Sequence, residues 1–108
     1  MKKEILGYDP VYFIDEDGNV YRNNKKMSPI NNGIGYFQVK LRRNGHRYQR
    51  YIHSLVWETF NGQIPKGYEI NHIDHDKSNN SLINLELVTH SENLKKAVEK
   101  HGHFGFLK

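Results

Sequence analysis

Residues 68–93 read YEINHIDHDKSNNSLINLELVTHSEN, and the order of apolar and polar residues in this stretch indicates the fold. Tyr68–His72 and Leu85–Val88 have the composition of short β-strands. The twelve positions between them, 73–84, are rich in Asp, Asn, Ser and Lys, which predicts a polar loop. We therefore expect two short strands joined by a long loop.

A helix is expected to follow the second strand. Thr89 and Glu92 have the spacing of a capping box, in which each side chain satisfies a backbone N–H of the other residue. The helix is predicted from about residue 90 to residue 100, and residues 101–108 are expected to form a tail. Residues 68–100 thus form a predicted ββα unit.

The ends of these elements carry the side chains of greatest chemical interest. Asn71 and His72 close the first strand, Asn84 opens the second, and Asn93 lies in the first turns of the helix. Converging oxygen ligands suit a hard cation such as Mg²⁺ or Mn²⁺. A neutral histidine beside such an ion is well placed to deprotonate water.

Each of these residues also has an ordinary structural interpretation. A single histidine at the end of a strand more often forms hydrogen bonds with its neighbours than takes part in catalysis. The polar residues of the loop are expected to build it through side-chain-to-backbone bonds, rather than to bind metal. This second interpretation covers Asp74, Asp76, Asn79 and Asn80.

The clearest local signal in the sequence lies before residue 68 and predicts a β-hairpin. Two alternating runs, Tyr36–Arg43 and His46–His53, flank Asn44-Gly45, the preferred pair for a type I′ hairpin turn. This turn sets the register, so that residues 43 and 46, 42 and 47, and 41 and 48 are expected to face one another.

One face of this predicted hairpin is apolar apart from Arg50, and the other is basic. The apolar face contains Phe37, Val39, Leu41, Tyr48 and Ile52. The opposite face contains Gln38, Lys40, Arg42, Arg47, Gln49 and Tyr51. No acidic residue occurs from Tyr36 to His53. A solvated outer face is one interpretation, and contact with a DNA backbone is the other.

Shorter elements complete the expected layout. Ser54–Phe60 has helical periodicity, with Ser54 as the expected N-cap, Gly62 as the stop and Pro65 blocking continuation. This helix is expected to cover the apolar face of the hairpin. Another hairpin is predicted from Val11–Asp15 and Asn19–Arg22 around a turn, and residues 23–35 are rich in turn-forming residues.

The composition limits the class of protein. The chain has 108 residues, a formal charge of +4, 36% hydrophobic residues and no cysteine. Its isoelectric point is about 9.3 and its mean hydropathy is −0.84. Disulfides and cysteine zinc sites are thereby excluded, and a basic balance favours polyanionic partners. No signal peptide and no apolar run of about 18 residues is present, so we expect a cytoplasmic protein without a membrane span.

Several blocks in order resemble the HNH homing endonucleases of phages and phage introns. The match covers residues 53–97, and residues 8–52 look like the small β-rich module that precedes the nuclease motif in that family. The matching blocks are His53–Phe60, Asn71–Asp74, Asp76–Asn80, Asn84-Leu85, Val88-Thr89 and Ser91–Asn93.

The resemblance implies a role for each matching residue. It implies that His72 is the general base, that the side-chain carbonyl of Asn84 orients the imidazole, and that Asn93 is a metal ligand. Asn71 stands where many members have a metal-binding aspartate, so we expect a weaker, neutral ligand there. His53 is expected to be structural or to support the site indirectly.

The α+β fold class follows, with N-terminal antiparallel hairpins and a short helix before a ββα-metal nuclease motif. The expected units are a β-rich module over 1–52, the nuclease motif over 53–100 and a tail over 101–108. The resemblance implies a DNA endonuclease with one Mg²⁺ or Mn²⁺ per site, acting on double-stranded DNA as a monomer or homodimer. The residues expected to contact DNA are Lys40, Arg42, Arg47, Gln49 and Lys77.

Two other functions remain open at this point. The neutral Asn71 would also suit a DNA-binding protein that keeps the fold with little or no catalysis. A transcription factor that reads DNA with the 36–53 hairpin is the third interpretation, but it leaves the ordered residues from Asn71 to Asn93 unexplained. A His residue at position 75, where the family has a glycine turn, is expected to adopt left-handed backbone.

Overall fold

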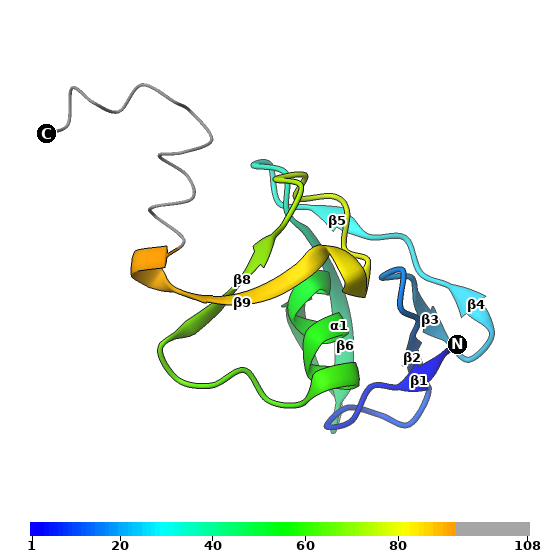
Figure 1. The fold of residues 1–108 in the computed structure, drawn as a ribbon. Helices are drawn as coiled ribbons and strands as arrows, with labels where there is room; N and C mark the ends of the chain where they lie inside the picture. The colour runs from blue at the N-terminus through cyan, green and yellow to red at the C-terminus, as the bar shows by residue number, and fades with distance from the viewer. Residues whose placement is uncertain (93–108) are drawn as a thin grey trace, which may run out of the picture.

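Short antiparallel strands and one helix make up the computed structural model, which describes residues 1–92 (Figure 1). The first sheet contains β1 (Lys3–Glu4), β2 (Tyr12–Ile14), β3 (Val20–Arg22) and β4 (Lys25–Lys26), in that order. The second contains β5 (Ile30–Asn31), β6 (Phe37–Arg43) and β7 (His46–Tyr51). The third pairs β8 (Tyr68–His72) with β9 (Leu85–Thr89).

The β6–β7 hairpin has the predicted turn and register. Asn44 has φ 52° and Gly45 has φ 81°, the left-handed backbone that a type I′ turn requires at both central positions. Leu41 pairs with Tyr48, and Arg43 pairs with His46. The period of two then places alternate side chains of β6 in the core and in solvent, as expected.

The helix α1 (Ile52–Asn61) begins two residues earlier than predicted, and β7 ends at Tyr51 instead of continuing to His53. The prediction of Ser54 as N-cap is wrong, because Tyr51 holds that position and makes no side-chain cap bond. Burial explains the shift: Ile52 is 3% exposed and His53 is 9% exposed, and a helical first turn directs both inward. The helix ends at Asn61, and Gly62, the predicted stop, is its C-cap with φ 91°.

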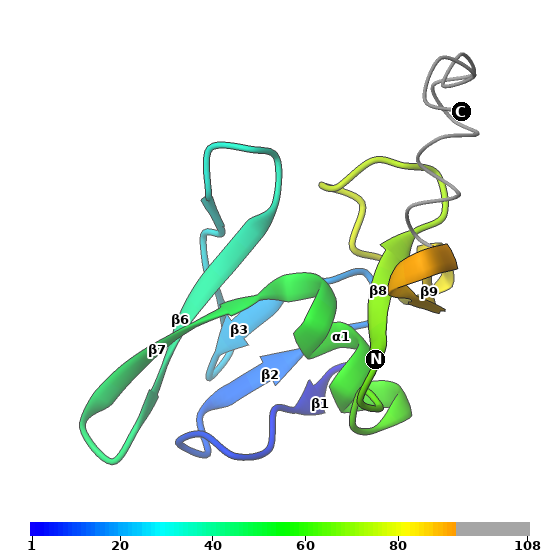
Figure 2. The same ribbon diagram turned by 90° about the vertical axis from the view of Figure 1, so that its left-hand side faces the viewer.

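One hydrophobic core connects the three sheets through α1. The helix packs against β6 and β7 on one side and against β1 and β2 on another (Figure 2). Leu85 of β9 joins the same cluster. The side chains with least exposure come from β2, β3, β6 and α1, and they are Ile14, Val20, Val39, Leu41, Leu55 and Val56. The predicted α+β class is confirmed by this arrangement.

Some elements were not predicted from the sequence because they are very short. The strands β1, β4 and β5 have two residues each, too few to show a period. A 3-10 turn, η1 (Leu82–Asn84), closes the loop before β9.

The chain after β9 starts a helix as predicted. Residues 90–92 are helical, the backbone N–H of Thr89 donates to Glu92 Oε1 at 2.8 Å, and Glu92 N–H donates to Thr89 Oγ1 at 3.2 Å. This is the expected capping box. The remainder of the predicted helix, Asn93 and the tail lie outside the described residues. Among residues 1–92, no helix is long and apolar enough to cross a membrane.

Candidate active site

The β8–β9 ladder fixes the two residues at the centre of the site. Asn71 pairs with Glu86, and His72 pairs with Leu85, at the end of β8 where the polar loop begins. Asn71 is 9% exposed and His72 is 5% exposed, so both polar side chains are buried. Buried polar groups require hydrogen-bond partners, and each of the two residues has one.

The partner of Asn71 is the carboxylate of Glu86. Asn71 Nδ2 donates to Glu86 Oε2 at 2.7 Å, which turns the amide so that its oxygen Oδ1 is left for another partner. Glu86 also brings a negative charge beside Asn71, which the expectation of a neutral site did not include. The pairing of the two strands would have indicated Glu86, because it lies directly opposite Asn71 in the ladder.

The partner of His72 is Asn80, not Asn84. The distance from His72 Nε2 to Asn80 Oδ1 is 2.8 Å, and Asn80 is itself 6% exposed. Asn80 was expected only to build the loop. Its approach to His72 has no signal in the sequence, because it depends on how the loop of residues 73–84 folds back over β8.

Asn84 holds the base of the loop. Its Oδ1 accepts from the backbone N–H of Asp74 at 3.0 Å, and its Nδ2 donates to Asp74 Oδ1 and to the carbonyl of Asn79, each at 2.9 Å. The structure therefore places Asn84 against Asp74 and Asn79, and its amide does not make the predicted bond to the imidazole. Both Nδ2 hydrogens and the Oδ1 atom of Asn84 bind partners within the loop, and these contacts hold the amide against Asp74 and Asn79.

Asp74 is the centre of this loop network. Besides Asn84, it accepts from Asn79 Nδ2 at 2.8 Å and from the backbone N–H of Asp76 at 2.8 Å. These hydrogen bonds, that from Asn79 first, lower the pKa of Asp74 from 3.8 to about 2. His75 adopts φ 64°, the left-handed backbone expected at the turn that follows.

His53 packs against His72 from the first turn of α1. Their ring centroids are 5.1 Å apart in an edge-to-face arrangement, and His53 stacks on Tyr51 at 5.1 Å. Burial lowers the pKa of His53 from 6.5 to about 4, and the neighbouring His72 adds to this effect. The buried His53 Nδ1 has no hydrogen-bond partner among residues 1–92, so the ring is a neutral packing element.

Tyr36 and Lys77 close one side of this aromatic group. The ring of Tyr36 lies 5.4 Å from that of His53 and 6.1 Å from that of His72. Lys77 Nζ lies 4.7 Å from the centroid of Tyr36 and donates to the carbonyl of Ile34 at 3.2 Å. Lys77 therefore connects the loop to the start of β6, and its charge remains at the rim of the site.

The other expected DNA contacts lie on the outer face of the hairpin. Lys40, Arg42, Arg47 and Gln49 are all exposed, and Arg42 pairs directly with Arg47 across the ladder. Like charges in directly opposite positions repel, so this pair favours an anionic partner. Arg22 of β3 joins Lys40, Arg42 and Arg47 around a hollow of about 310 Å³.

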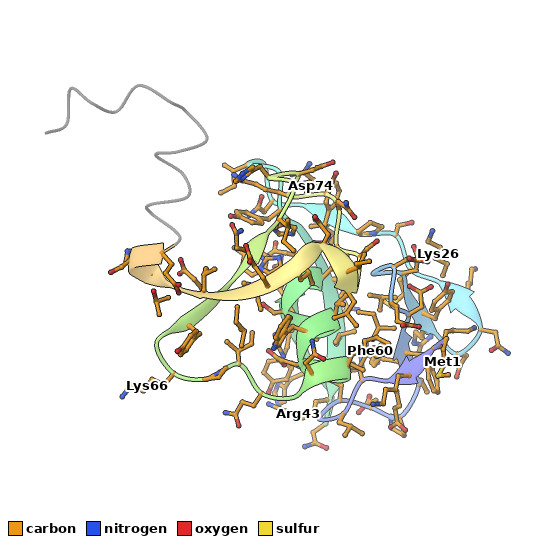
Figure 3. All side chains as sticks on the ribbon, in the orientation of Figure 1. Met1, Lys26, Arg43, Phe60, Lys66 and Asp74 are labelled. Carbon is orange, nitrogen blue, oxygen red and sulfur yellow. The ribbon has the colours of Figure 1, made fainter. Side chains whose placement is uncertain are left out.

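The basic face extends away from His72. Counting from Tyr36, which contacts His72, Arg42 lies about 20 Å further along the strand at about 3.3 Å per residue. Figure 3 shows Asp74 of the loop and Arg43 beside the hairpin turn at opposite ends of the molecule. The site and the basic face thus lie in line along the hairpin.

The donor set suits a hard cation. Asn71 Oδ1 and the nearby Glu86 carboxylate are oxygen donors, the type that Mg²⁺ and Mn²⁺ prefer. Within residues 1–92, no group of three or more His, Cys, Asp or Glu side chains gathers to hold a metal ion. A cation at this place would therefore depend on amide oxygens, a single carboxylate and oxygens from elsewhere, such as phosphate.

Known proteins resemble this chain in sequence and in fold. Residues 50–95 match the model of a family described as HNH endonuclease. Two uncharacterized HNH endonucleases of Acanthamoeba polyphaga mimivirus are similar to this chain. One is 38% identical over 86 residues, which is 77% of this chain and 26% of the relative. The other is 40% identical over 102 residues, which is 90% of this chain and 25% of the relative.

A solved structure extends the likeness to the N-terminal strands. The HNH homing endonuclease I-HmuI, in a structure that describes its DNA binding and cleavage, superposes with a TM-score of 0.85 at 27% identity. The superposition covers 94% of this chain and 59% of that chain, while the chain spans about a quarter of the length of the two viral relatives. Residues 50–95 of this chain therefore form an HNH endonuclease domain, and the chain as a whole shares the fold of an HNH homing endonuclease.

Proposed function

We propose that this chain is a metal-dependent endonuclease that hydrolyses phosphodiester bonds in double-stranded DNA. The observation that carries the proposal is that Asn71 and His72 follow one another at the end of β8. Both side chains are buried, and each is hydrogen-bonded to another side chain. An amide oxygen that could bind a cation, next to an oriented imidazole, suits water attack on a phosphodiester.

In this proposal His72 is the general base. A neutral imidazole accepts a proton from water near neutral pH, because its ordinary pKa of about 6.5 is close to that pH. Asn84 acts through the loop: it holds Asp74 and Asn79, and with them the segment that returns to His72. His53 supports the imidazole by packing against it.

One Mg²⁺ or Mn²⁺ is proposed to bind at Asn71 and Asn93, with Glu86 beside Asn71. When bound, the ion would supply charge neutralisation for the phosphate and for the leaving oxygen. The neutral amides make this a weak site by themselves, so the phosphates of DNA are expected to complete it.

The exposed Lys40, Arg42, Arg47 and Gln49, together with Lys77 at the rim, are the proposed contacts to the DNA backbone. Cations near phosphates release condensed counterions, so binding should weaken steeply with salt. We propose that the protein acts in the cytoplasm of a bacterial or phage-infected cell, as a monomer or homodimer.

Cleavage of a supercoiled plasmid tests this proposal through its cation. Conversion to the nicked or linear form is expected with Mg²⁺ or Mn²⁺ and should stop with EDTA. Cleavage that returns when Mg²⁺ is added back would support metal dependence, whereas cleavage that is undiminished in EDTA would overturn it.

The second candidate function is a DNA-binding protein with the same fold and little catalysis, and the neutral Asn71 motivates it. Under this alternative the natural chain should not cut at about 1 mM Mg²⁺, a range in which weak hard-cation sites fill. Asn71→Asp should then create cleavage. Efficient cutting by the natural chain would exclude the alternative.

A further inference from the structure

The turn of the N-terminal hairpin lies directly against the loop that covers His72. The carbonyl of Glu16 accepts from the backbone N–H of Leu82 at 2.7 Å. Gly18, with φ 87°, approaches Asn80 so closely that an added Cβ would lie 2.9 Å from Asn80 Cβ and 3.1 Å from its carbonyl oxygen. Only a glycine fits there, both for its backbone angle and for the space beside Asn80.

Asn80 in turn faces the imidazole with an atom that can only accept. Its Oδ1 lies 2.8 Å from His72 Nε2, and an amide oxygen has no hydrogen to donate. The hydrogen of this bond must therefore be on Nε2. A neutral imidazole carries one N–H, so the lone pair that accepts a proton is then on Nδ1.

We propose that Asn80 is a positioning residue that holds His72 in the Nε2–H tautomer, and that the Gly18 turn keeps Asn80 in place. The tautomer leaves Nδ1 as the nitrogen that takes the proton from water, while Nε2 keeps its hydrogen throughout. The part of the inference that concerns proton transfer rests on the proposed function, but the tautomer itself does not.

This arrangement gives the N-terminal β-rich segment a part in the chemistry of the site. The connection passes from the β2–β3 turn at Gly18 to Asn80 and then to His72. Asn80 is 6% exposed, so water cannot readily replace its amide as the partner of the ring. Loss of this contact would free the ring to exchange tautomers and to rotate.

Nitrogen NMR of the full chain with ¹⁵N-labelled histidine tests the tautomer directly. The spectrum is recorded near pH 8, above the ordinary imidazole pKa of about 6.5, and His72 is assigned from its loss in His72→Gln. The proposal expects the Nε2–H form in the natural chain. A His72 ring with its hydrogen on Nδ1 would overturn the proposal.

Two substitutions at position 80 separate the hydrogen bond from packing. Asn80→Asp keeps an oxygen acceptor in the same shape, so it should keep the Nε2–H form. Asn80→Leu keeps a similar shape without the acceptor, so a second tautomer should appear and cleavage should fall about 10-fold to 100-fold. Identical His72 spectra for the natural chain and Asn80→Leu would contradict the positioning role.

A matched pair of glycine substitutions tests the turn. Gly18→Ala and Gly7→Ala both place a side chain at positive φ, +87° and +91°. Apart from its chain neighbours, however, no residue in the described part of the chain lies within 4 Å of a Cβ at Gly7. Gly18→Ala should disturb the His72 nitrogen signals and slow cleavage about 10-fold, and Gly7→Ala should leave both unchanged. Equal effects of the two would show strain alone and overturn the role of the turn.

The outcomes also separate this inference from the proposed function. A chain that does not cut DNA but shows the Nε2–H form, dependent on Asn80, would refute the nuclease and retain the positioning role. A chain that cuts DNA with His72 in the Nδ1–H form would retain the nuclease and refute the positioning role.

Discussion

The β6–β7 hairpin and the loop of residues 73–84 obtain their shapes in different ways. The hairpin depends on a regular ladder of backbone hydrogen bonds and on the two-residue turn at Asn44-Gly45. The loop depends on the side chains of Asp74, Asn79 and Asn84, which bind one another and the backbone. One region is determined by its main chain, and the other by a few individual side chains.

The difference predicts that the two regions respond differently to substitution. The fold of the hairpin rests on its backbone ladder and turn, so substitutions of its outward side chains should change its charge more than its shape. The loop has to place Asn80 and His72 within a hydrogen bond of each other, so each of its anchors matters. Single substitutions should therefore have large effects on cleavage in the loop and graded effects on DNA binding in the hairpin.

Apart from changes to His72 itself, the largest effect is expected from Asp74→Ala, which removes the carboxylate that joins Asn79, Asn84 and the backbone of Asp76. A displacement of the loop by about 1 Å should slow plasmid cleavage about 100-fold. Asp76→Ala is the matched control, because within the described residues the Asp76 carboxylate binds only Ser78. Equal losses for the two substitutions would show that the Asp74 network has no special part.

His53 provides the next test, because it lies where the hairpin and the site meet. Its pKa is about 4 in the folded chain, below the ordinary 6.5. Between these two pH values, His53 is therefore mostly protonated in the unfolded chain and mostly neutral in the folded chain. Stability should therefore fall as the pH decreases from about 6.5 towards 4, by about 2 kcal/mol between pH 7 and pH 5.

Urea unfolding at pH 7 and at pH 5 measures this effect. The carboxylates, with lower ordinary pKa values of about 4, stay ionised across that interval. His53→Phe keeps a ring among Tyr36, Tyr51 and His72 and should remove this pH dependence. His46→Gln, at an exposed position of β7, should leave it intact. A full pH dependence in His53→Phe would assign the effect to another group.

A smaller, graded effect is expected on the basic face. Removing one phosphate contact with Arg47→Gln should reduce the slope of log K against log salt concentration by about 1. Arg43→Gln is the control on the neighbouring strand, because its guanidinium lies 4.5 Å from the ring centroid of Tyr48 and donates to the Gly7 carbonyl at 3.3 Å. Fluorescence titration of a labelled duplex at several salt concentrations would detect the difference. An unchanged slope for Arg47→Gln would show that this face does not contact DNA.

The smallest effect is expected at the hairpin turn. Gly45 has φ 81°, and an alanine there should cost about 1 kcal/mol of stability. Because the turn is distant from His72, cleavage at saturating DNA should stay at the natural rate. Slower cleavage by Gly45→Ala under those conditions would show that the hairpin turn affects the site, and would contradict the distinction between the two regions.

The same difference explains what the sequence predicts well. Regular alternation and Asn44-Gly45 were enough for the register of β6 and β7, and the spacing of Thr89 and Glu92 was enough for the helix start. The start of α1 was not predicted, because burial of Ile52 and His53 outweighs the capping preference of Ser54.

Within the site, the sequence indicated His72 and Asn71 but not their partners. Glu86 follows from the pairing of β8 with β9, which a sequence suggests only once the register is known. Asn80 could not be inferred, because neighbouring asparagines in one loop look alike until their contacts are seen. Its position depends on Gly18, which is far away in the chain and has no side chain to signal a contact.

The most direct test of the central claim compares the natural chain with His72→Ala on a supercoiled plasmid in Mg²⁺, with duplex affinity measured on the same preparations. His75→Asn, which keeps a residue tolerant of φ 64°, is the control for the loop. His72→Ala should cut about 10²–10⁴-fold more slowly while its DNA affinity is retained. Undiminished cutting by His72→Ala would show that His72 is not the general base.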